Sequence, residues 1–303
     1  MARARFRAWW EGEEFDEAAA AAAFEQAAND VEPEPTPPEG EPDIFAEEPL
    51  ELPPRLAALA KLWGEGRVAP GDETAEALEP ARLGLEANGV LAVLGPGLVA
   101  PLKALAGAHQ GEIAAFEWRD ETRGTLHEML KRANLSRIVP APLDLDTWAP
   151  AAETYDGILS LDEFTYAANA PRLAVQIAKA LKPGACAVIE TYCAVPTPAL
   201  PPAFAASFAE PQLRPAGDIA EVLTDAGLTV EANEDLSAEH GELARNGFKR
   251  LEAALAEAVG EGLDPNVMRE IAWEAEAWRE RLKLLAQKRL ERRRLIVRKA
   301  AAS

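Results

Sequence analysis

The chain has few of the residues from which disulfides and metal sites are built. Its 303 residues include only two cysteines and three histidines: Cys186, Cys193, His109, His127 and His240. The cysteines are seven positions apart in one expected strand and would point to opposite faces, which argues against a disulfide. The histidines are scattered and lack the spacing of metal ligands. We therefore expect reduced thiols, no bound metal and a cytoplasmic protein.

Long apolar runs are also missing. No apolar stretch approaches the roughly 20 residues that a membrane-spanning helix needs. The start of the chain is basic, but the alanine run at 18–23 is short and is flanked by acidic residues, so it does not resemble the apolar core of a secretory signal. The sequence predicts neither a membrane span nor a signal peptide.

Positive charge is absent from residues 8–54, which contain fifteen acidic residues and no lysine or arginine. Residues 1–7 carry three arginines, which leaves −8 of the net charge of −20 for residues 55–303. A body this mildly acidic argues against nonspecific binding to nucleic acid. The acidic, Pro-rich segment 31–54 cannot bury enough apolar surface to offset the entropy of ordering it. We expect 1–54 to be a tail, helical over 16–28 and disordered beyond, and 55–303 to be the folded domain.

The tail begins with aromatic residues in a helical pattern. Phe6, Trp9 and Trp10 are spaced i, i+3 and i+4, so they would share one helix face beside the arginines of 1–7. Tryptophans are costly to leave in water, so we expect this face to be covered. A groove on a partner protein and the chain's own body are equally compatible with the pattern. An anionic membrane surface is disfavoured, because one short segment anchors weakly and dense negative charge follows it.

Residues 155–194 show the clearest secondary-structure pattern. An apolar run ends in acidic residues, apolar residues then recur at helical spacing, and Pro183 with Gly184 ends the helix before a second apolar run. Two buried parallel strands joined by a helix are typical of a doubly wound α/β domain. We expect strands at 90–94, 112–117, 137–140, 155–161, 185–192, 228–233 and 294–297. We expect helices at 98–106, 120–133, 170–181 and 217–226, and a helical insert at 236–290.

Glycines follow the first expected strand, and acidic residues follow the next two. Gly95 and Gly97 permit a sharp turn and the close approach of a ligand, although packing alone can also demand glycine there. Glu117 ends the second strand, where it could accept hydrogen bonds from ribose hydroxyls or lie solvated. Asp144 could accept from an adenine amino group with Leu145 packed against the ring, or it could belong to a turn.

Further candidates come from the fourth strand and the insert. Asp162 and Glu163 stand at the mouth of a strand, where acids position a substrate or cap a helix. His240 lies in the insert; we expect a surface position, and a role as a catalytic base is the alternative. Trp273 and Trp278 are expected to belong to the core side of the last helix.

Together these segments resemble the class I S-adenosylmethionine-dependent methyltransferases over roughly residues 55–299. The most specific matches are YDGILSLDEF and IAKALKPGACAVIETY, while LWGEGRVAPG and AEHGELARNGFKRL are similar to small-molecule N-methyltransferases. The resemblance implies an α/β fold with a doubly wound, mostly parallel seven-stranded sheet whose last strand is antiparallel. It also implies methyl transfer from S-adenosylmethionine to a small molecule or a protein. The residues implied to bind the cofactor are Gly95, Gly97, Glu117, Asp144, Leu145 and Asp162.

The glycine motif departs from the family pattern at two positions. Val93 stands where an acid usually precedes the first glycine, and Val99 stands where a third glycine is usual. The first change removes a charged anchor for the turn or for the cationic end of the cofactor. The second adds bulk where close approach is needed. Two hypotheses therefore remain open: an active methyltransferase, or a degenerate relative that acts as a scaffold or regulator through its tail.

Overall fold

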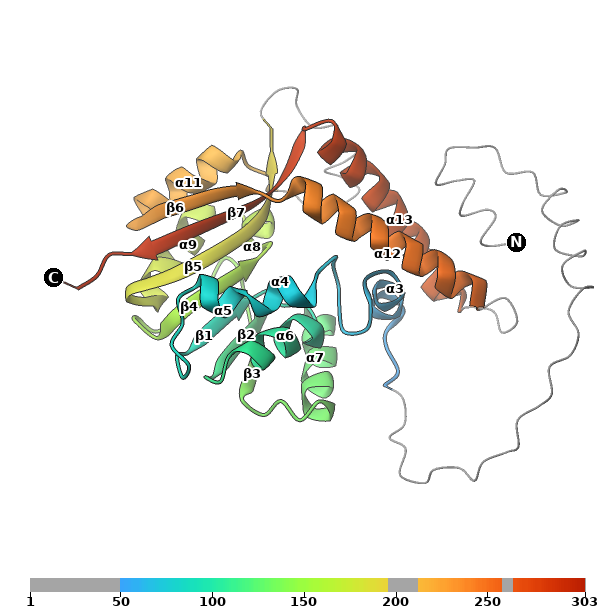
Figure 1. The fold of residues 1–303 in the computed structure, drawn as a ribbon, viewed down its shortest axis with the longest axis horizontal. Helices are drawn as coiled ribbons and strands as arrows, with labels where there is room; N and C mark the ends of the chain where they lie inside the picture. The colour runs from blue at the N-terminus through green and yellow to red at the C-terminus, as the bar shows by residue number, and fades with distance from the viewer. Residues whose placement is uncertain (1–49, 196–211, 258–263, 303) are drawn as a thin grey trace, which may run out of the picture.

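The computed structural model describes residues 50–195, 212–257 and 264–302. A seven-stranded sheet in the order β3-β2-β1-β4-β5-β7-β6 forms its centre, with helices on both faces (Figure 1). The strands are β1 (Leu91–Leu94), β2 (Ile113–Glu117), β3 (Ile138–Pro142), β4 (Tyr155–Leu161), β5 (Leu181–Ala194), β6 (Leu228–Asp235) and β7 (Leu290–Lys299). The expected helix at 16–28 and the aromatic residues Phe6, Trp9 and Trp10 lie outside the described residues.

The strand pairing is that of a doubly wound domain. β1 pairs in parallel with β2 and β4, β2 pairs in parallel with β3, and β4 pairs in parallel with β5. β7 is antiparallel to both of its neighbours, β5 and β6. All four residues of β1 are buried, as expected for a central parallel strand that is covered on both faces. The fold class expected from the sequence is confirmed.

Most element boundaries lie within two residues of the expected ones, but β5 and β7 are longer. α9 (Ala170–Ala180) ends as Leu181 turns to the extended conformation, so β5 begins before Pro183 and Gly184 rather than after them. β7 pairs along β5 from Cys186 to Ala194, which extends it beyond the expected four residues.

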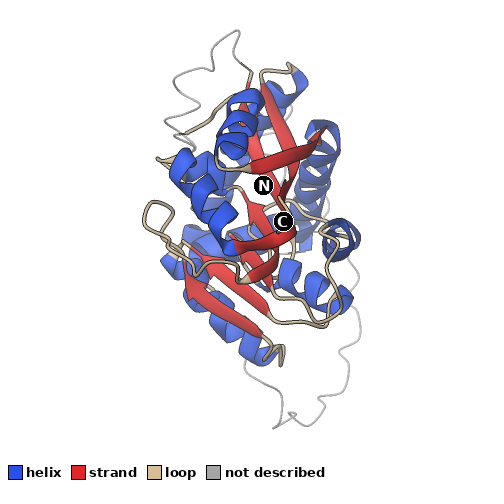
Figure 2. Cartoon of the chain, turned by 90° about the vertical axis from the view of Figure 1, so that its left-hand side faces the viewer, coloured by secondary structure: helices blue, strands red, loops and turns tan. Residues whose placement is uncertain are grey.

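Helices cover both faces of the sheet (Figure 2). Two hydrophobic cores lie on these opposite faces, since alternate residues of β1 belong to one core or to the other. The first is formed with α3 (Pro54–Trp63), α6 (Val99–Ala108), α7 (Asp120–Arg132), α12 (Ser237–Glu257) and α13 (Pro265–Ala286). The second is formed with α8 (Glu163–Tyr166), α9 and α11 (Ala216–Asp225). Cys186 belongs to the first core and Cys193 to the second, and both are free thiols, so the prediction of opposite faces is confirmed.

The helical insert between β6 and β7 consists of α12 and α13, which lie side by side and both contact α3 (Figure 1). Trp278 is 2% exposed and meets the ring of Trp63 edge to face, with ring centroids 5.1 Å apart. The prediction for Trp273 is wrong, because this side chain is 61% exposed. Five residues of helix rotate it by about 140° from Trp278, off the buried stripe. None of the helices within the described ranges is long and apolar enough to cross a membrane.

Candidate functional site

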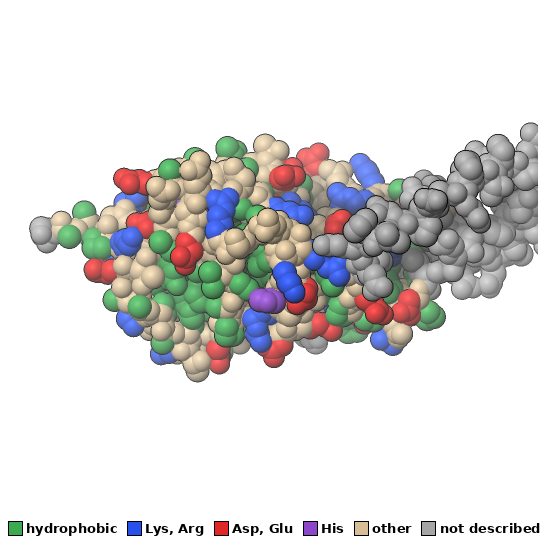
Figure 3. Space-filling view, turned by 90° about the horizontal axis from the view of Figure 1, so that it is seen from below, with side chains coloured by type: hydrophobic (Ala, Val, Ile, Leu, Met, Phe, Trp, Pro, Cys, Tyr) green, Lys and Arg blue, Asp and Glu red, His purple; other side chains and the backbone are tan. Residues whose placement is uncertain are grey.

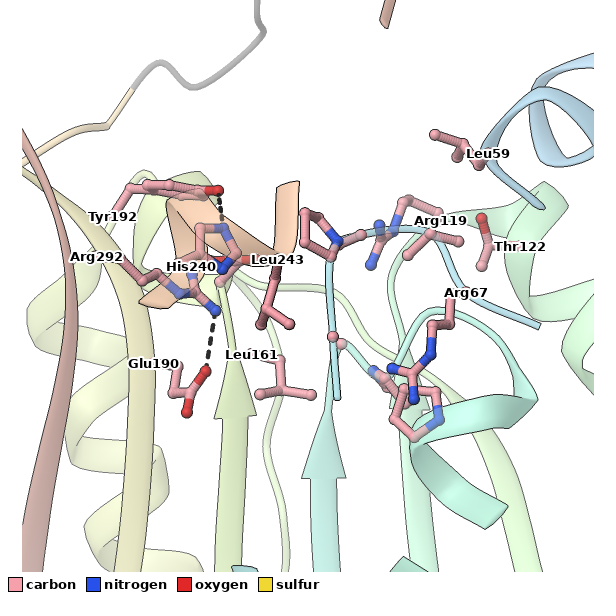
Figure 4. A pocket seen from close by; sticks show the side chains of 18 of the residues that line it. Leu59, Arg67, Arg119, Thr122, Leu161, Glu190, Tyr192, His240, Leu243 and Arg292 are labelled. Carbon is pink, nitrogen blue, oxygen red and sulfur yellow. Dashed lines mark hydrogen bonds and ion pairs between the residues drawn. The ribbon is translucent and has the colours of Figure 1, made fainter. Parts of the chain in front are cut away.

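A cavity of about 1170 Å³ opens at the carboxyl ends of β1, β4 and β5. Ligands of doubly wound domains bind at this edge of the sheet. One wall comes from β5, β7 and the insert, and the opposite wall comes from the segment before β1 and the loop after β2 (Figure 4). Typical ligand pockets measure about 300–1,000 Å³, so this cavity has room for a nucleoside and a second small molecule.

The turn after β1 lies at the edge of this cavity. Gly95 and Gly97 have φ angles of 68° and 71°, in the left-handed region that favours glycine. A Cβ on Gly95 would lie 1.8 Å from Oε1 of Glu163, and a Cβ on Gly97 would lie 2.3 Å from Cγ2 of Val68. The protein's own packing therefore requires both glycines, while Gly95 also lines the cavity.

The two valines that depart from the family pattern are buried and do not line the cavity. Val93 is fully buried in the first core, as a central strand residue should be. Val99 is also buried there, and its Cγ1 would lie 2.8 Å from a Cβ on Gly66. Neither side chain lines the cavity, so the bulk of Val99 does not close it.

Glu117 stands where a ribose-binding acid is expected, but its carboxylate is already occupied. Oε1 accepts hydrogen bonds from the backbone N and from Nε of Arg119, at 2.9 and 2.7 Å. Oε2 accepts from the backbone N of Gly97 at 2.8 Å and from Nη2 of Arg119 at 3.2 Å. A carboxylate has about four acceptor sites. A ribose can therefore reach this acid only if the Arg119 side chain moves.

The expected adenine-binding residues lie at the outer edge of the site. Oδ1 of Asp144 accepts from the backbone N of Asp146 and of Thr147, which holds a turn. A hydrogen bond from the Thr147 side chain, together with these two backbone bonds, lowers the pKa of the exposed Asp144 carboxyl. The alternative of a turn residue is therefore realised. Leu145 lines both the main cavity and a smaller hollow beside it, which is walled by Trp118 and Tyr166.

Asp162 lines the cavity in a strained conformation, with a φ of 77°. Its carboxylate pairs with Nη1 of Arg292, and Nη2 of the same guanidinium pairs with Glu190 at 3.2 Å. Burial by itself would raise the pKa of Glu190, but Arg292 and Arg294 outweigh that effect and lower it. The acid expected to contact a ligand is thus the end of an ion-pair chain, of which Figure 4 shows the link between Arg292 and Glu190.

Glu163 is fully buried behind the glycine turn and does not line the cavity. Oε2 accepts a hydrogen bond from Oγ of Ser160 at 2.7 Å, whereas Oε1 has no hydrogen-bond partner. Burial raises the pKa of this carboxyl to about 8, and the Ser160 bond offsets only part of that effect. At neutral pH Glu163 is therefore largely protonated.

His240 lies in α12 and faces the cavity, so the expected surface position is wrong. Its Nε2 lies 2.6 Å from the hydroxyl of Tyr192. Burial, with added repulsion from Arg292 and Arg281, lowers the pKa of the imidazole well below its usual value. His240 is thus neutral at pH 7. His127 is exposed, as expected.

Sequence reasoning missed several residues of this wall. Tyr192 is a buried residue near the end of β5, and the guanidinium groups of Arg292 and Arg281 lie over its ring, at 5.0 and 5.6 Å. Glu79, in α5 (Glu79–Arg82), is 3% exposed at the cavity and 3.2 Å from Nη2 of Arg294. Burial raises the pKa of Glu79 to about 7. The pairing of Glu190 with Arg294 across β5 and β7 brings these groups together.

Outside the cavity the charges are mixed. Basic and acidic side chains are interspersed on the face seen from below, without a continuous basic stripe on that face (Figure 3). Within the described residues no cluster of histidine, cysteine, aspartate and glutamate has the geometry of a metal site.

Comparison with known proteins gives matches to solved structures alone: no protein family model and no curated protein matches the chain. Phosphoethanolamine N-methyltransferase 2 of Haemonchus contortus matches with a TM-score of 0.71 at 16% identity, over 81% of this chain and 57% of that one. Geranyl diphosphate C-methyltransferase of Streptomyces coelicolor matches with a TM-score of 0.56 at 11% identity, over 75% and 79%. The [4+2]-cyclase SpnF matches with 0.63 at 15%, over 84% and 98%.

The chain has the class I methyltransferase fold. The resemblance stated from the sequence is confirmed at the level of the fold. The chain spans a little over half of the length of the Haemonchus enzyme. At these identities the likeness establishes the fold and not the activity, since one fold carries many functions.

Proposed function

We propose that the protein transfers a methyl group from S-adenosylmethionine to a small-molecule acceptor. The observation that carries the proposal is the cavity at the carboxyl ends of β1, β4 and β5, which Val93 and Val99 leave open. Two of the matching methyltransferases were crystallised with S-adenosylhomocysteine, and both also hold a small-molecule substrate, phosphomonomethylethanolamine or geranyl diphosphate.

The residues at the cavity fit the cofactor. The Gly95–Gly97 turn borders it, and Leu145 with Trp118 supplies apolar surface for a base. Glu117 is fully buried and does not itself line the cavity, but it supplies an acid at the end of β2 beside Arg119, which does. The one rearrangement required is that Arg119 leaves the carboxylate of Glu117. When bound, S-adenosylmethionine would supply an electrophilic methyl group on its sulfonium.

The protein's part in such a reaction is to position the acceptor and to keep water out. The insert closes the acceptor side, where Trp278, His240 and Tyr192 line the cavity. Neutral His240 is hydrogen-bonded to the Tyr192 hydroxyl, and this pair gives the acceptor side polar groups that can orient a methyl acceptor by hydrogen bonding. Arg292 is held in place by two carboxylates and gives this wall a fixed positive group.

Calorimetric titration with S-adenosylmethionine and S-adenosylhomocysteine tests the proposal. We expect micromolar binding that Glu117→Ala abolishes, because the ribose loses its acceptor. Glu112→Ala is the matched control, since this exposed acid precedes the opposite end of β2 and should leave binding unchanged. Binding that survives Glu117→Ala, or no binding by the wild type, contradicts the proposal.

A second candidate function is that of a non-catalytic scaffold or regulator. The saturated carboxylate of Glu117 and the ion-paired carboxylate of Asp162 favour it, since both expected ligand-binding acids already have protein partners. No cofactor binding by the wild type, regained in Val93→Asp with Val99→Gly, would support this function. A pull-down with residues 1–28, compared with Trp9→Ala and Trp10→Ala, would then test the tail for a protein partner.

A further inference from the structure

Glu163 is the buried carboxyl that the proposed function leaves without a role. It is fully buried, its Oε1 has no hydrogen-bond partner, and this oxygen packs directly against Gly95. An unpartnered buried carboxyl is costly to the fold, so its place behind the turn needs a reason.

The charged groups around Glu163 do not neutralise it. Asp162, the neighbouring residue, and Glu117, behind the same turn, both raise the pKa of this carboxyl. Arg119 is within electrostatic reach, but its guanidinium is bound to Glu117. Ser160 is the one side chain that donates a hydrogen bond to the Glu163 carboxyl among the described residues. The site would therefore gain from a cation brought by a ligand.

A layer one residue thick separates the Glu163 carboxyl from a ligand in the cavity. Gly95 and Asp162 line the cavity, and Glu163 lies one layer behind them. Gly95 has no side chain to interpose, and Pro96 has no N–H that could donate to Oε1. Val93, on the strand that leads to the turn, is apolar and turned into the core. The acidic side chain behind the turn is thus Glu163, which follows β4, and not a residue of β1.

We infer that Glu163 supplies the negative charge opposite a bound S-adenosylmethionine, in place of the acid that Val93 replaces, and that it releases its proton to solvent when this cation binds. The inference rests on the proposed function. S-adenosylmethionine carries one net positive charge, from a sulfonium, an ammonium and a carboxylate. S-adenosylhomocysteine lacks the sulfonium and is neutral overall, so its binding should release a smaller fraction of a proton from Glu163.

The test is calorimetric titration of the full chain between pH 6 and pH 9, in buffers that differ in ionisation enthalpy. For a carboxyl whose free pKa is about 8, a fall of one pKa unit on binding makes the affinity for S-adenosylmethionine about tenfold higher at pH 9 than at pH 6. Proton release should be clear at pH 7 and smaller for S-adenosylhomocysteine. Glu163→Gln should remove both effects with the same ligand, which controls for titration of the ligand itself, whereas Glu112→Gln should leave them unchanged.

Ser160→Ala provides a second test if Glu163→Gln does not fold. This change removes the donor that stabilises the ionised carboxylate, so the rise in affinity should move to higher pH. Binding to the wild type at equal affinity from pH 6 to pH 9, without proton release, would overturn the inference and leave the methyltransferase proposal standing. An absence of binding at every pH would instead refute the proposed function.

Discussion

Replacing Arg119 by alanine should lower the stability of the ligand-free protein and raise its affinity for the cofactor. The Arg119 side chain donates two charge-assisted hydrogen bonds to Glu117, at 2.7 and 3.2 Å. Such bonds contribute about 1.5–3 kcal/mol each when buried, but the Arg119 side chain is 32% exposed, so we take about 2 kcal/mol for the pair. Thermal unfolding without ligand should occur about 4–8 °C lower.

The loss of the same interaction, about 2 kcal/mol, should make the binding of the cofactor more favourable. If the ribose must displace Arg119 to reach Glu117, the variant no longer has to break that pair, and its affinity for S-adenosylmethionine should rise about 10- to 30-fold. Calorimetry measures this change. Arg123→Ala is the control, because the Arg123 guanidinium pairs with Asp120 and not with Glu117. Unchanged or weaker binding in Arg119→Ala would refute the displacement and indicate that Arg119 itself holds the ligand.

Three further predictions concern the walls of the cavity. Burial raises the pKa of Glu79 in the folded protein to about 7 from 4.5, so its contribution to stability is present at pH 4 and is lost as the pH rises to 7. At pH 8 the Glu79→Gln variant should therefore be more stable than the wild type, by up to about 3 kcal/mol in urea unfolding. At pH 4 the variant should be no more stable than the wild type. Trp278→Ala should cost about 3–5 kcal/mol and Trp273→Ala less than about 0.5 by the same measurement; equal losses would contradict the observed burial. Tyr192→Phe should cost about 1–3 kcal/mol in thermal unfolding, because it leaves buried His240 without its partner, and an unchanged melting temperature would contradict that bond.

The sheet could be predicted because its signals are local. Apolar runs, helical spacing and the breaks at proline and glycine are properties of short segments, and the strands found from them are all present. The ends of β5 and β7 could not be predicted in this way. They are set by pairing between residues about 100 positions apart, as between Glu190 and Arg294.

The candidate site was predicted less well, for physical reasons that differ from residue to residue. His240 lies on the same buried stripe of α12 as Ala244, Phe248 and Leu251. The helical spacing of these residues in the sequence therefore already indicated that His240 is buried. Glu117 and Arg119, which form an ion pair, are only two residues apart in the sequence. Their pairing nevertheless depends on the conformations of both side chains and on how closely the turn at Gly97 approaches the Glu117 carboxylate. No pattern of residue types reports that geometry.

The position of β7 between β5 and β6 has a consequence for how the chain acquires this sheet. Of the described strands, β6 pairs with β7 alone, so residues 228–235 have no place to dock until residues 290–299 arrive. During synthesis the whole of the insert emerges from the ribosome in that interval, while one edge of β5 keeps its backbone N–H and C=O groups unpaired. We expect this waiting period, rather than the formation of the parallel strands, to be when the nascent protein depends most on chaperones.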